Sequence, residues 1–221
     1  MESTSAREKA FWNIRKRIMN LDLKPMDVLS EKELEAEMGM SRTPIREALI
    51  MLSLSHLVVV RPQSRTYVSP IDLEKVRIEQ FSRYVLEKEM AVCACKTMRE
   101  EHWQQYEETM RLYEFYENSH IEEREERMFE LDNDFHRTTF WINGQESCFD
   151  WMLSTFQHVE RIRILSLRMG LDDKISHQHR KIASAIRTRD PEQAGQAILE
   201  HLMEYQRHVP IMREEYPHYF Q

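Results

Sequence analysis

The sequence has little glycine, little cysteine and no long apolar run. Four glycines among 221 residues, with a hydrophobic fraction of 41%, indicate a compact and mostly helical protein. No apolar run approaches the length needed to cross a bilayer, and the N-terminal segment MESTSAREKAFW lacks the apolar part of a secretory signal. These absences favour a cytoplasmic protein with no membrane partner.

Cysteine is too scarce for a disulfide framework. Cys93 and Cys95 are two positions apart on an expected helix, so they face different directions, and Cys148 has no evident partner. The three cysteines therefore agree with a cytoplasmic location.

Charge is unevenly distributed along the chain. The whole sequence has a formal net charge of −7, but residues 1–70 contain 11 Lys and Arg against 9 Asp and Glu, and the remainder contains 20 against 29. The modest positive charge is thus confined to the N-terminal segment. An acidic body favours solubility and disfavours nonspecific contact with DNA through the wrong face.

Residues 30–57 predict two short helices joined by a tight turn. Ser30 followed by Glu33 forms a capping-box pattern at the start of the first helix, and Gly39 suits the left-handed backbone that ends it. Thr43 can cap the second helix, with a proline following at its first helical position. The buried face of that helix is expected to consist of Ile45, Ala48, Leu49 and Leu52.

Basic side chains at the start of the second helix point to DNA. Arg42 and Arg46 lie there, and Lys32 is nearby on the first helix, where a recognition helix meets base edges and phosphates. The runs at residues 56–60 and 66–68 predict a two-stranded hairpin, the wing of a winged helix-turn-helix. The alternative, an ordinary helical subdomain with solvated arginines, is disfavoured because caps, turn, arginines and wing occur in order.

The run LSEKELEAEMGMSRTPIREAL resembles the DNA-binding domain of the GntR family of bacterial transcription regulators, and SRTPIREAL is its most specific part. The resemblance implies a winged helix-turn-helix domain over residues 1–70 that binds a double-stranded DNA operator. It also implies operator contacts from the matching positions Lys32, Ser41, Arg42, Thr43 and Arg46, with the wing tip in the minor groove.

Three positions depart from the family pattern: Asp27, His56 and Arg65. Arg65 stands at the wing tip, where glycine is usual, so the close backbone approach of the wing to DNA is in question. A guanidinium there would instead bind phosphate or a narrow minor groove. We therefore place Arg65 among the predicted DNA-binding residues.

After Ser69 and Pro70 the pattern becomes helical at a period of 3.6 residues, so a second domain is expected over residues 71–221. About six helices are the simplest division of this all-α bundle. They are expected at residues 71–98, 100–118, 121–142, 146–169, 172–188 and 191–208.

Four polar residues of this second domain lie on apolar faces. Asp132 and His136 are four residues apart, so they share one helix face. His179 and His201 stand eleven residues before and after Asp190, in the turn between the last two helices. In an antiparallel hairpin they come level, both roughly 16 Å from the turn. A carboxylate and three imidazoles directed into one bundle are costly to bury unless they are paired or bind a metal.

On these residues alone, a metal site competes with separate core histidines and a simple Asp132–His136 pair. Residues 72–208 resemble FCD, the ligand-binding domain of the FadR-like subfamily of GntR regulators. Metal-bearing FCD domains use an Asp and a His four apart and two later histidines, which match Asp132, His136, His179 and His201. A divalent Zn, Ni, Mn or Fe ion suits this donor set. His177 and Asp134 are second choices, because they face other directions.

Arg83 falls where FCD-type proteins place an arginine near a bound acid, and a guanidinium can bind a carboxylate through two hydrogen bonds. The resemblance therefore implies an effector-binding role for Arg83. The alternative is an intrahelical ion pair with Glu87, one turn further on. Arg161 and Arg163 are weaker candidates.

Together these patterns predict a homodimeric DNA-binding transcription regulator, a repressor rather than an activator. A small organic acid, bound at or near the metal, is expected to control it. No general acid or base is evident beside the site, which disfavours a metal-dependent enzyme. A regulator that senses the metal itself, and a purely structural metal, remain as alternatives.

Overall fold

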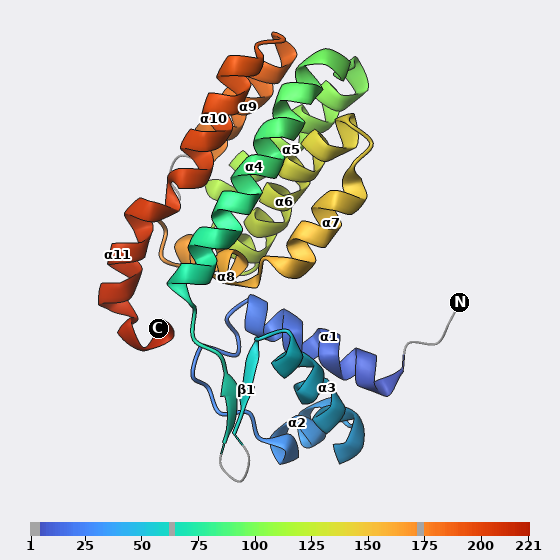
Figure 1. Ribbon diagram of the computed structural model, residues 1–221, viewed down its shortest axis with the longest axis vertical. Coiled ribbons are helices and arrows are strands. Elements are labelled where there is room, and N and C mark those ends of the chain that lie inside the picture. Colours follow the sequence, from blue (N-terminus) through green and yellow to red (C-terminus); the bar gives the residue numbers. More distant parts are fainter. Residues whose placement is uncertain (1–4, 62–64, 172–174) are drawn as a thin grey trace. The chain divides into compact units, whose positions relative to one another are not determined.

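The computed structural model describes residues 5–61, 65–171 and 175–221, and the chain divides into two compact units. The first comprises residues 1–73 together with residues 213–221, and the second comprises residues 74–212. Helices dominate the chain, which confirms the predicted mostly α fold class (Figure 1). Within the described residues, none of the helices combines the length and the apolar character needed to cross a membrane.

The first unit begins with α1 (Ala6–Met19), a helix that was not among the predicted elements. Ser5 Oγ accepts a hydrogen bond from the Glu8 amide, and the Glu8 carboxylate accepts one from the Ser5 amide. This complete capping box is a sequence signal that would have predicted the helix. Ile14 and Ile18 of α1 are fully buried and pack in one core with α2 and α3.

The helices α2 (Glu31–Met38) and α3 (Arg42–Leu54) form the predicted helix-turn-helix. Ser30 Oγ accepts from the Glu33 amide at 3.3 Å, as the first half of the capping box requires. Gly39 ends α2 with φ 62°, the left-handed conformation expected of it.

The start predicted for α3 is wrong by two residues. Ser41 directly precedes the helix and makes no side-chain capping hydrogen bond, while Thr43 lies inside the first turn and is not the N-cap residue. Pro44 is nevertheless compatible, because the amides of a first turn have no helical partner to lose. The buried face is as predicted and consists of Ile45, Ala48, Leu49 and Leu52.

The strands β1 (Val58–Val60) and β2 (Thr66–Val68) form the predicted antiparallel hairpin, with Val58 opposite Val68. Both of these valines are buried in the core of the first unit. Residues 62–64 of the turn lie outside the described residues. On either side of them, the Arg61 amide donates to the Arg65 carbonyl at 3.2 Å.

The C-terminal residues belong to the first unit. After the short 3-10 helix η1 (Pro217–Tyr219), Phe220 pairs with Ile71 in a parallel bridge. The Ile71 amide donates to the Tyr219 carbonyl at 2.7 Å, and the Gln221 amide donates to the Ile71 carbonyl at 3.1 Å. The domain boundary expected after residue 70 did not place the C-terminal residues with the first unit. So short a pairing leaves no periodic pattern in the sequence.

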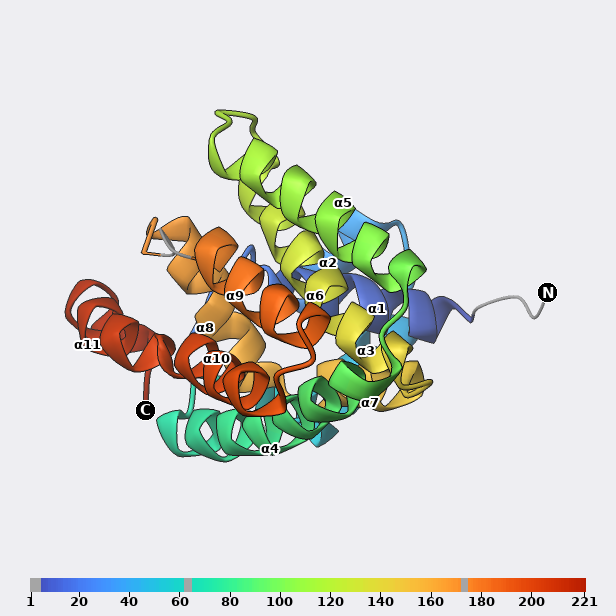
Figure 2. The same cartoon turned by 90° about the horizontal axis from the view of Figure 1, so that it is seen from above.

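The second unit is helical throughout its described residues. Its helices are α4 (Leu73–Thr97), α5 (Glu100–Glu117), α6 (Arg124–Ile142), α7 (Glu146–Thr155), α8 (Gln157–Arg168), α9 (Ile175–Arg187), α10 (Pro191–Met203) and α11 (Tyr205–Glu215), the last of which runs on into the first unit. Figures 1 and 2 show α9 beside α10 and α5 beside α6. The sixth predicted helix ends at Met203, and α11 follows as a separate helix.

The fourth predicted helix of the bundle is wrong, because α7 and α8 are separated at Phe156. This residue is 6% exposed and has ψ 71°, outside the helical range. The Glu79 carboxylate of α4 accepts hydrogen bonds from the amides of His158 and Val159, at 2.9 and 2.8 Å. The first turn of α8 is thus capped by a residue 79 positions away, which no local pattern reveals.

Candidate metal centre and DNA-binding surface

Three helices of the second unit bring the four predicted metal-site residues together. Asp132 and His136 lie one turn apart on α6, His179 lies on α9 and His201 on α10. One possible ligand atom from each residue lies within 4.8 Å of all the others. Asp132, His136 and His179 are 5%, 0% and 1% exposed, so these polar groups are held away from water.

The possible ligand atoms lie close together, and two of them are within hydrogen-bonding distance of each other. His136 Nε2 lies 3.0 Å from His201 Nε2 and 3.8 Å from Asp132 Oδ1. His179 Nε2 lies 3.0 Å from Asp132 Oδ1, but the orientation is not that of a hydrogen bond. Within the described chain both atoms are buried without a hydrogen-bond partner, which is costly unless a further group binds them.

The outer nitrogens of two imidazoles lie against other side chains. Glu87 Oε2 of α4 is 2.6 Å from His136 Nδ1, and Gln178 Oε1 is 2.8 Å from His201 Nδ1. Both neighbours are acceptor oxygens, so they favour a proton on Nδ1. The lone pair of Nε2 is then directed to the centre of the cluster in both rings.

Burial and charge set the protonation states of the cluster. Burial lowers the pKa of His179 to about 4 and holds the pKa of His201 well below its usual value, so both rings are neutral near pH 7. Burial alone would raise the pKa of Asp132, but Arg163 and His179 keep it well below its usual range. A carboxylate with neutral imidazoles is the form that binds a metal ion.

The residues present therefore fit a divalent metal ion. One carboxylate and three imidazoles, with converging ligand atoms of which Asp132 Oδ1 and His179 Nε2 lack a hydrogen bond, suit Zn, Ni, Mn or Fe. Four protein ligands would complete a tetrahedral ion, whereas a six-coordinate ion would keep positions for water or an acid. The second choices, His177 and Asp134, are both exposed and stand outside the cluster.

A cavity of about 60 Å³ adjoins the cluster. Such a volume accommodates a few water molecules or a small ligand. Its wall includes Gln80, Arg83, Asp132, Arg163, His201 and His208.

Both arginines in the cavity wall are paired with carboxylates. Arg83 Nε donates to Glu87, the intrahelical ion pair that was the alternative role for Arg83. Arg163 donates through one terminal nitrogen to Glu160 at 2.6 Å and through the other to Asp132. Among the described residues Arg83 pairs through Nε alone, whereas both terminal nitrogens of Arg163 are engaged. Arg161 is fully buried and forms no part of this wall.

Glu87 and Gln178 were not predicted as part of the site. In the sequence, Glu87 stands out only as a possible ion-pair partner of Arg83, one turn before it. Gln178 directly precedes His179, so helical spacing places it on another face, and it contacts His201 because α9 packs against α10. Contacts of this kind depend on packing between helices and have no signature in spacing along one helix.

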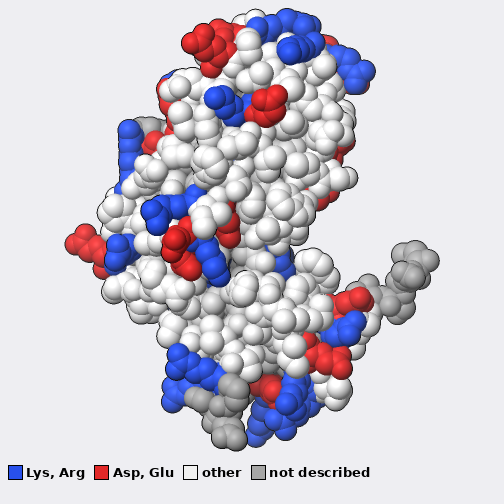
Figure 3. Space-filling view, viewed as in Figure 1, with Lys and Arg blue, Asp and Glu red and all other residues white. Residues whose placement is uncertain are grey.

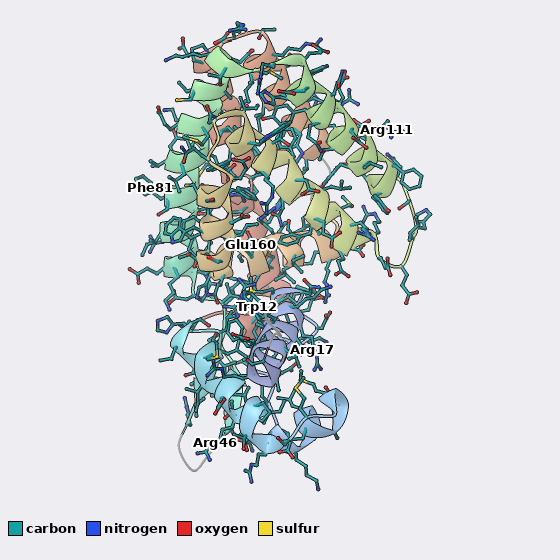
Figure 4. The ribbon with its side chains drawn as sticks, turned by 90° about the vertical axis from the view of Figure 1, so that its right-hand side faces the viewer. Trp12, Arg17, Arg46, Phe81, Arg111 and Glu160 are labelled. Atoms are coloured by element: carbon teal, nitrogen blue, oxygen red, sulfur yellow. The ribbon has the colours of Figure 1, made fainter. Side chains whose placement is uncertain are left out.

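The predicted DNA contacts are all exposed in the first unit. These side chains are Lys32, Ser41, Arg42, Thr43, Arg46 and Arg65. Figure 3 shows Lys and Arg gathered at the lower edge of this unit, and Figure 4 shows Arg46 projecting from α3. Arg42 Nε donates to Glu31 Oε2 at 2.5 Å, so the charge of Arg42 is partly neutralised within the unit.

Comparisons with known proteins agree with both parts of the chain. The family described as "Bacterial regulatory proteins, gntR family" matches residues 6–68, and "FCD domain" matches residues 81–204. The HTH-type transcriptional repressor RspR of Escherichia coli (strain K12) is 30% identical over 209 residues, covering 94% of this chain and 90% of RspR.

Two solved structures share the fold at 18% identity. A putative transcriptional regulator GntR from Rhodococcus sp. RHA1 has a TM-score of 0.73, with 92% of this chain and 97% of that chain covered. The E. coli protein McbR/YncC has a TM-score of 0.70, with 97% of this chain and 100% of that chain covered.

Proposed function

The chain belongs to the GntR family of bacterial regulatory proteins and is a DNA-binding transcription regulator with an FCD domain, and we propose that it is a repressor controlled by a small carboxylate-bearing metabolite. The metabolite would bind beside a divalent metal held by Asp132, His136, His179 and His201. The matched families and relatives are regulators and not enzymes, so the site would serve regulation in the cytoplasm.

One observation carries this proposal. Asp132 Oδ1 and His179 Nε2 are buried without hydrogen-bond partners in the described chain, and the Nε2 atoms of two further imidazoles face the same point. A divalent ion satisfies all four groups at once, whereas without it His136 and His201 share one hydrogen bond and Asp132 Oδ1 and His179 Nε2 have none.

The two units would have separate roles. The first unit, with α2, α3 and the wing, would bind the operator, and the second would bind metal and acid. Repression rather than activation is supported by RspR, which is named a repressor. Because the two units are joined by covalent connections after β2 and through α11, a change in the second unit can alter how two winged units fit their half-sites.

Arg83 is the best anchor for the acid. It lines the cavity beside the cluster, and only its Nε is used by Glu87 within the described residues. A guanidinium binds a carboxylate through its terminal nitrogens, while the other end of a small acid would reach the metal. The cavity of about 60 Å³ has room for a small acid.

A homodimer is supported by an apolar stripe on α4. Ile78, Phe81 and Val85 follow helical spacing and are 62%, 65% and 48% exposed. Figure 4 shows Phe81 pointing away from the bundle. Large apolar side chains in one exposed row favour burial against a second copy, and two copies would supply the two winged units that a two-part operator requires.

Thermal-shift screening of small organic acids, with and without added divalent metal, tests the proposal when operator binding is measured for each hit. Release of operator by an acid only in the metal-loaded protein would support it. Release by metal alone would indicate a metal sensor. An acid response that is indifferent to metal would leave the ion a structural role and contradict the proposal.

A further inference from the structure

We infer that Glu87 is a positioning residue for the metal centre, and that its ion pair with Arg83 couples metal affinity to occupancy of the neighbouring cavity. The inference rests on the proposed function, because it concerns the metal and the acid of the same site. It gives a role to the buried charges of Glu87 and Arg83, neither of which would be a metal ligand.

Glu87 has a partner on each side of its carboxylate. The side chain is 1% exposed, Oε1 accepts from Arg83 Nε, and Oε2 lies 2.6 Å from His136 Nδ1. A buried carboxylate is costly unless charged or polar groups compensate it, and these two do so. The contact with His136 lacks the geometry of a hydrogen bond, so it acts chiefly through the negative charge.

A carboxylate behind an imidazole changes how that imidazole binds a metal. The negative charge favours the proton on Nδ1 and makes Nε2 a stronger donor. His201 has a neutral neighbour instead, Gln178 Oε1 at 2.8 Å. His136 therefore has a negatively charged neighbour and His201 a neutral one. For this reason His136 is the stronger metal ligand of the two.

Arg83 moderates the charge of Glu87. Arg83 Nε donates a hydrogen bond to Glu87, and Arg83 also lines the cavity. There its terminal nitrogens would bind a ligand carboxylate. A bound carboxylate shares the charge of Arg83, so Glu87 is less neutralised and His136 binds the metal more strongly. By thermodynamic reciprocity, the metal then raises the affinity for the acid by the same factor.

Zn²⁺ affinity of the full-length protein, measured by competition with a chromogenic chelator, tests the role of Glu87. Glu87→Gln is expected to weaken Zn²⁺ binding about 10- to 100-fold, with unchanged stoichiometry at saturation. Glu89→Gln is the matched control, because Glu89 is exposed on the same helix, and it should bind as wild type does. Gln178→Glu should bind Zn²⁺ more tightly, since it places a negative charge behind His201.

The coupling is tested with acetate as the probe carboxylate. Acetate is expected to raise the Zn²⁺ affinity of wild type, and this effect should disappear in Arg83→Gln and shrink in Glu87→Gln. Because Glu87→Gln leaves the Arg83 charge buried and unpaired, the melting temperature of each metal-free variant is measured as well. If Glu87→Gln does not fold, Gln178→Glu and Arg83→Gln decide the question.

Three results would overturn the inference. They are wild-type Zn²⁺ affinity in folded Glu87→Gln, unchanged or weaker affinity in Gln178→Glu, and an acetate effect that persists in Arg83→Gln. A wild type that binds none of Zn²⁺, Ni²⁺, Mn²⁺ and Fe²⁺ would instead overturn the proposed function.

Discussion

His136 Nε2 and His201 Nε2 lie 3.0 Å apart, and each ring has its other nitrogen beside an acceptor oxygen. In neutral rings, a hydrogen bond between these two atoms needs a proton on one Nε2, and that ring then has no proton on Nδ1 for its acceptor oxygen. A divalent ion bound to both Nε2 atoms would leave both Nδ1 protons in place. We therefore expect a divalent ion to stabilise the folded protein.

His179→Ala is expected to lower the metal content and abolish the response to acid, while leaving basal operator affinity largely intact. Metal analysis and thermal unfolding check this, because wild type should gain about 2.7 kcal/mol at a metal concentration 100 times the dissociation constant. His177→Ala is the control, since His177 is exposed and only two residues away. Unchanged stoichiometry in purified His179→Ala would show that the ligand assignment is wrong.

Arg46→Ala should weaken operator binding by about 1–3 kcal/mol, because Arg46 is exposed in the first turns of α3, where base edges are read. Operator titrations at several salt concentrations measure the loss. Arg111→Ala removes the same charge from an exposed position on α5 and should leave affinity unchanged. Equal affinity for wild type and Arg46→Ala would mean that α3 is not the recognition helix.

Local signals in the sequence predicted much of the fold and the members of the cluster. The turn residue Gly39 and the four-residue spacing of Asp132 and His136 act within one helix or its end, so they can be seen in sequence. His179 and His201 could be predicted to lie at the same level because a short turn joins their helices. Counting residues from that turn gives the position of each along its helix. Their ring centroids are 4.9 Å apart.

What the sequence did not predict depends on residues far apart in the chain. Glu79 caps α8 across 79 positions, and Gln178 meets His201 from a neighbouring helix. The pairing of Ile71 with Phe220 likewise joins opposite ends of the chain. Single-sequence periodicity reports which face of a helix is apolar, but it does not report which helix will cover that face.

Glu31→Gln should strengthen DNA binding by releasing Arg42. Both side chains are near the surface and pair at 2.5 Å, so the gain is modest, about threefold at low salt and smaller as salt rises. Operator and nonspecific DNA titrations measure it. Glu33→Gln changes the net charge equally on the same helix without the Arg42 contact. A similar gain in Glu33→Gln would assign the effect to net charge alone.

Phe81→Asp should shift the proposed dimer toward monomer, because it places a charge in the apolar stripe of α4. Loss of a central aromatic contact typically costs about 2 kcal/mol or more of association free energy. Sedimentation measures the mass, and operator binding should weaken with it, since a monomer contacts one half-site. Phe115→Asp, at a residue 59% exposed on α5, is the control. A wild type that is monomeric at micromolar concentration would contradict the proposed interface.

Glu79→Gln should remove part of the pH dependence of stability. Burial raises the pKa of Glu79 to about 7, against 4.5 in the unfolded chain, despite the two backbone hydrogen bonds from α8. Between these values the folded state binds more protons than the unfolded state, so the free energy of unfolding falls as pH rises from about 4.5 to 7 and is flat above.

Glutamine keeps the acceptor oxygen for the amides of His158 and Val159 but carries no charge to bury. The free energy of unfolding of Glu79→Gln, relative to wild type, should therefore increase by roughly 1–3 kcal/mol between pH 5 and pH 8. Urea unfolding of metal-free protein at both pH values measures this difference. Glu89→Gln on the same helix should show no such change, and a Glu79→Gln difference that is constant with pH would mean that Glu79 is already ionised in the folded protein at pH 5.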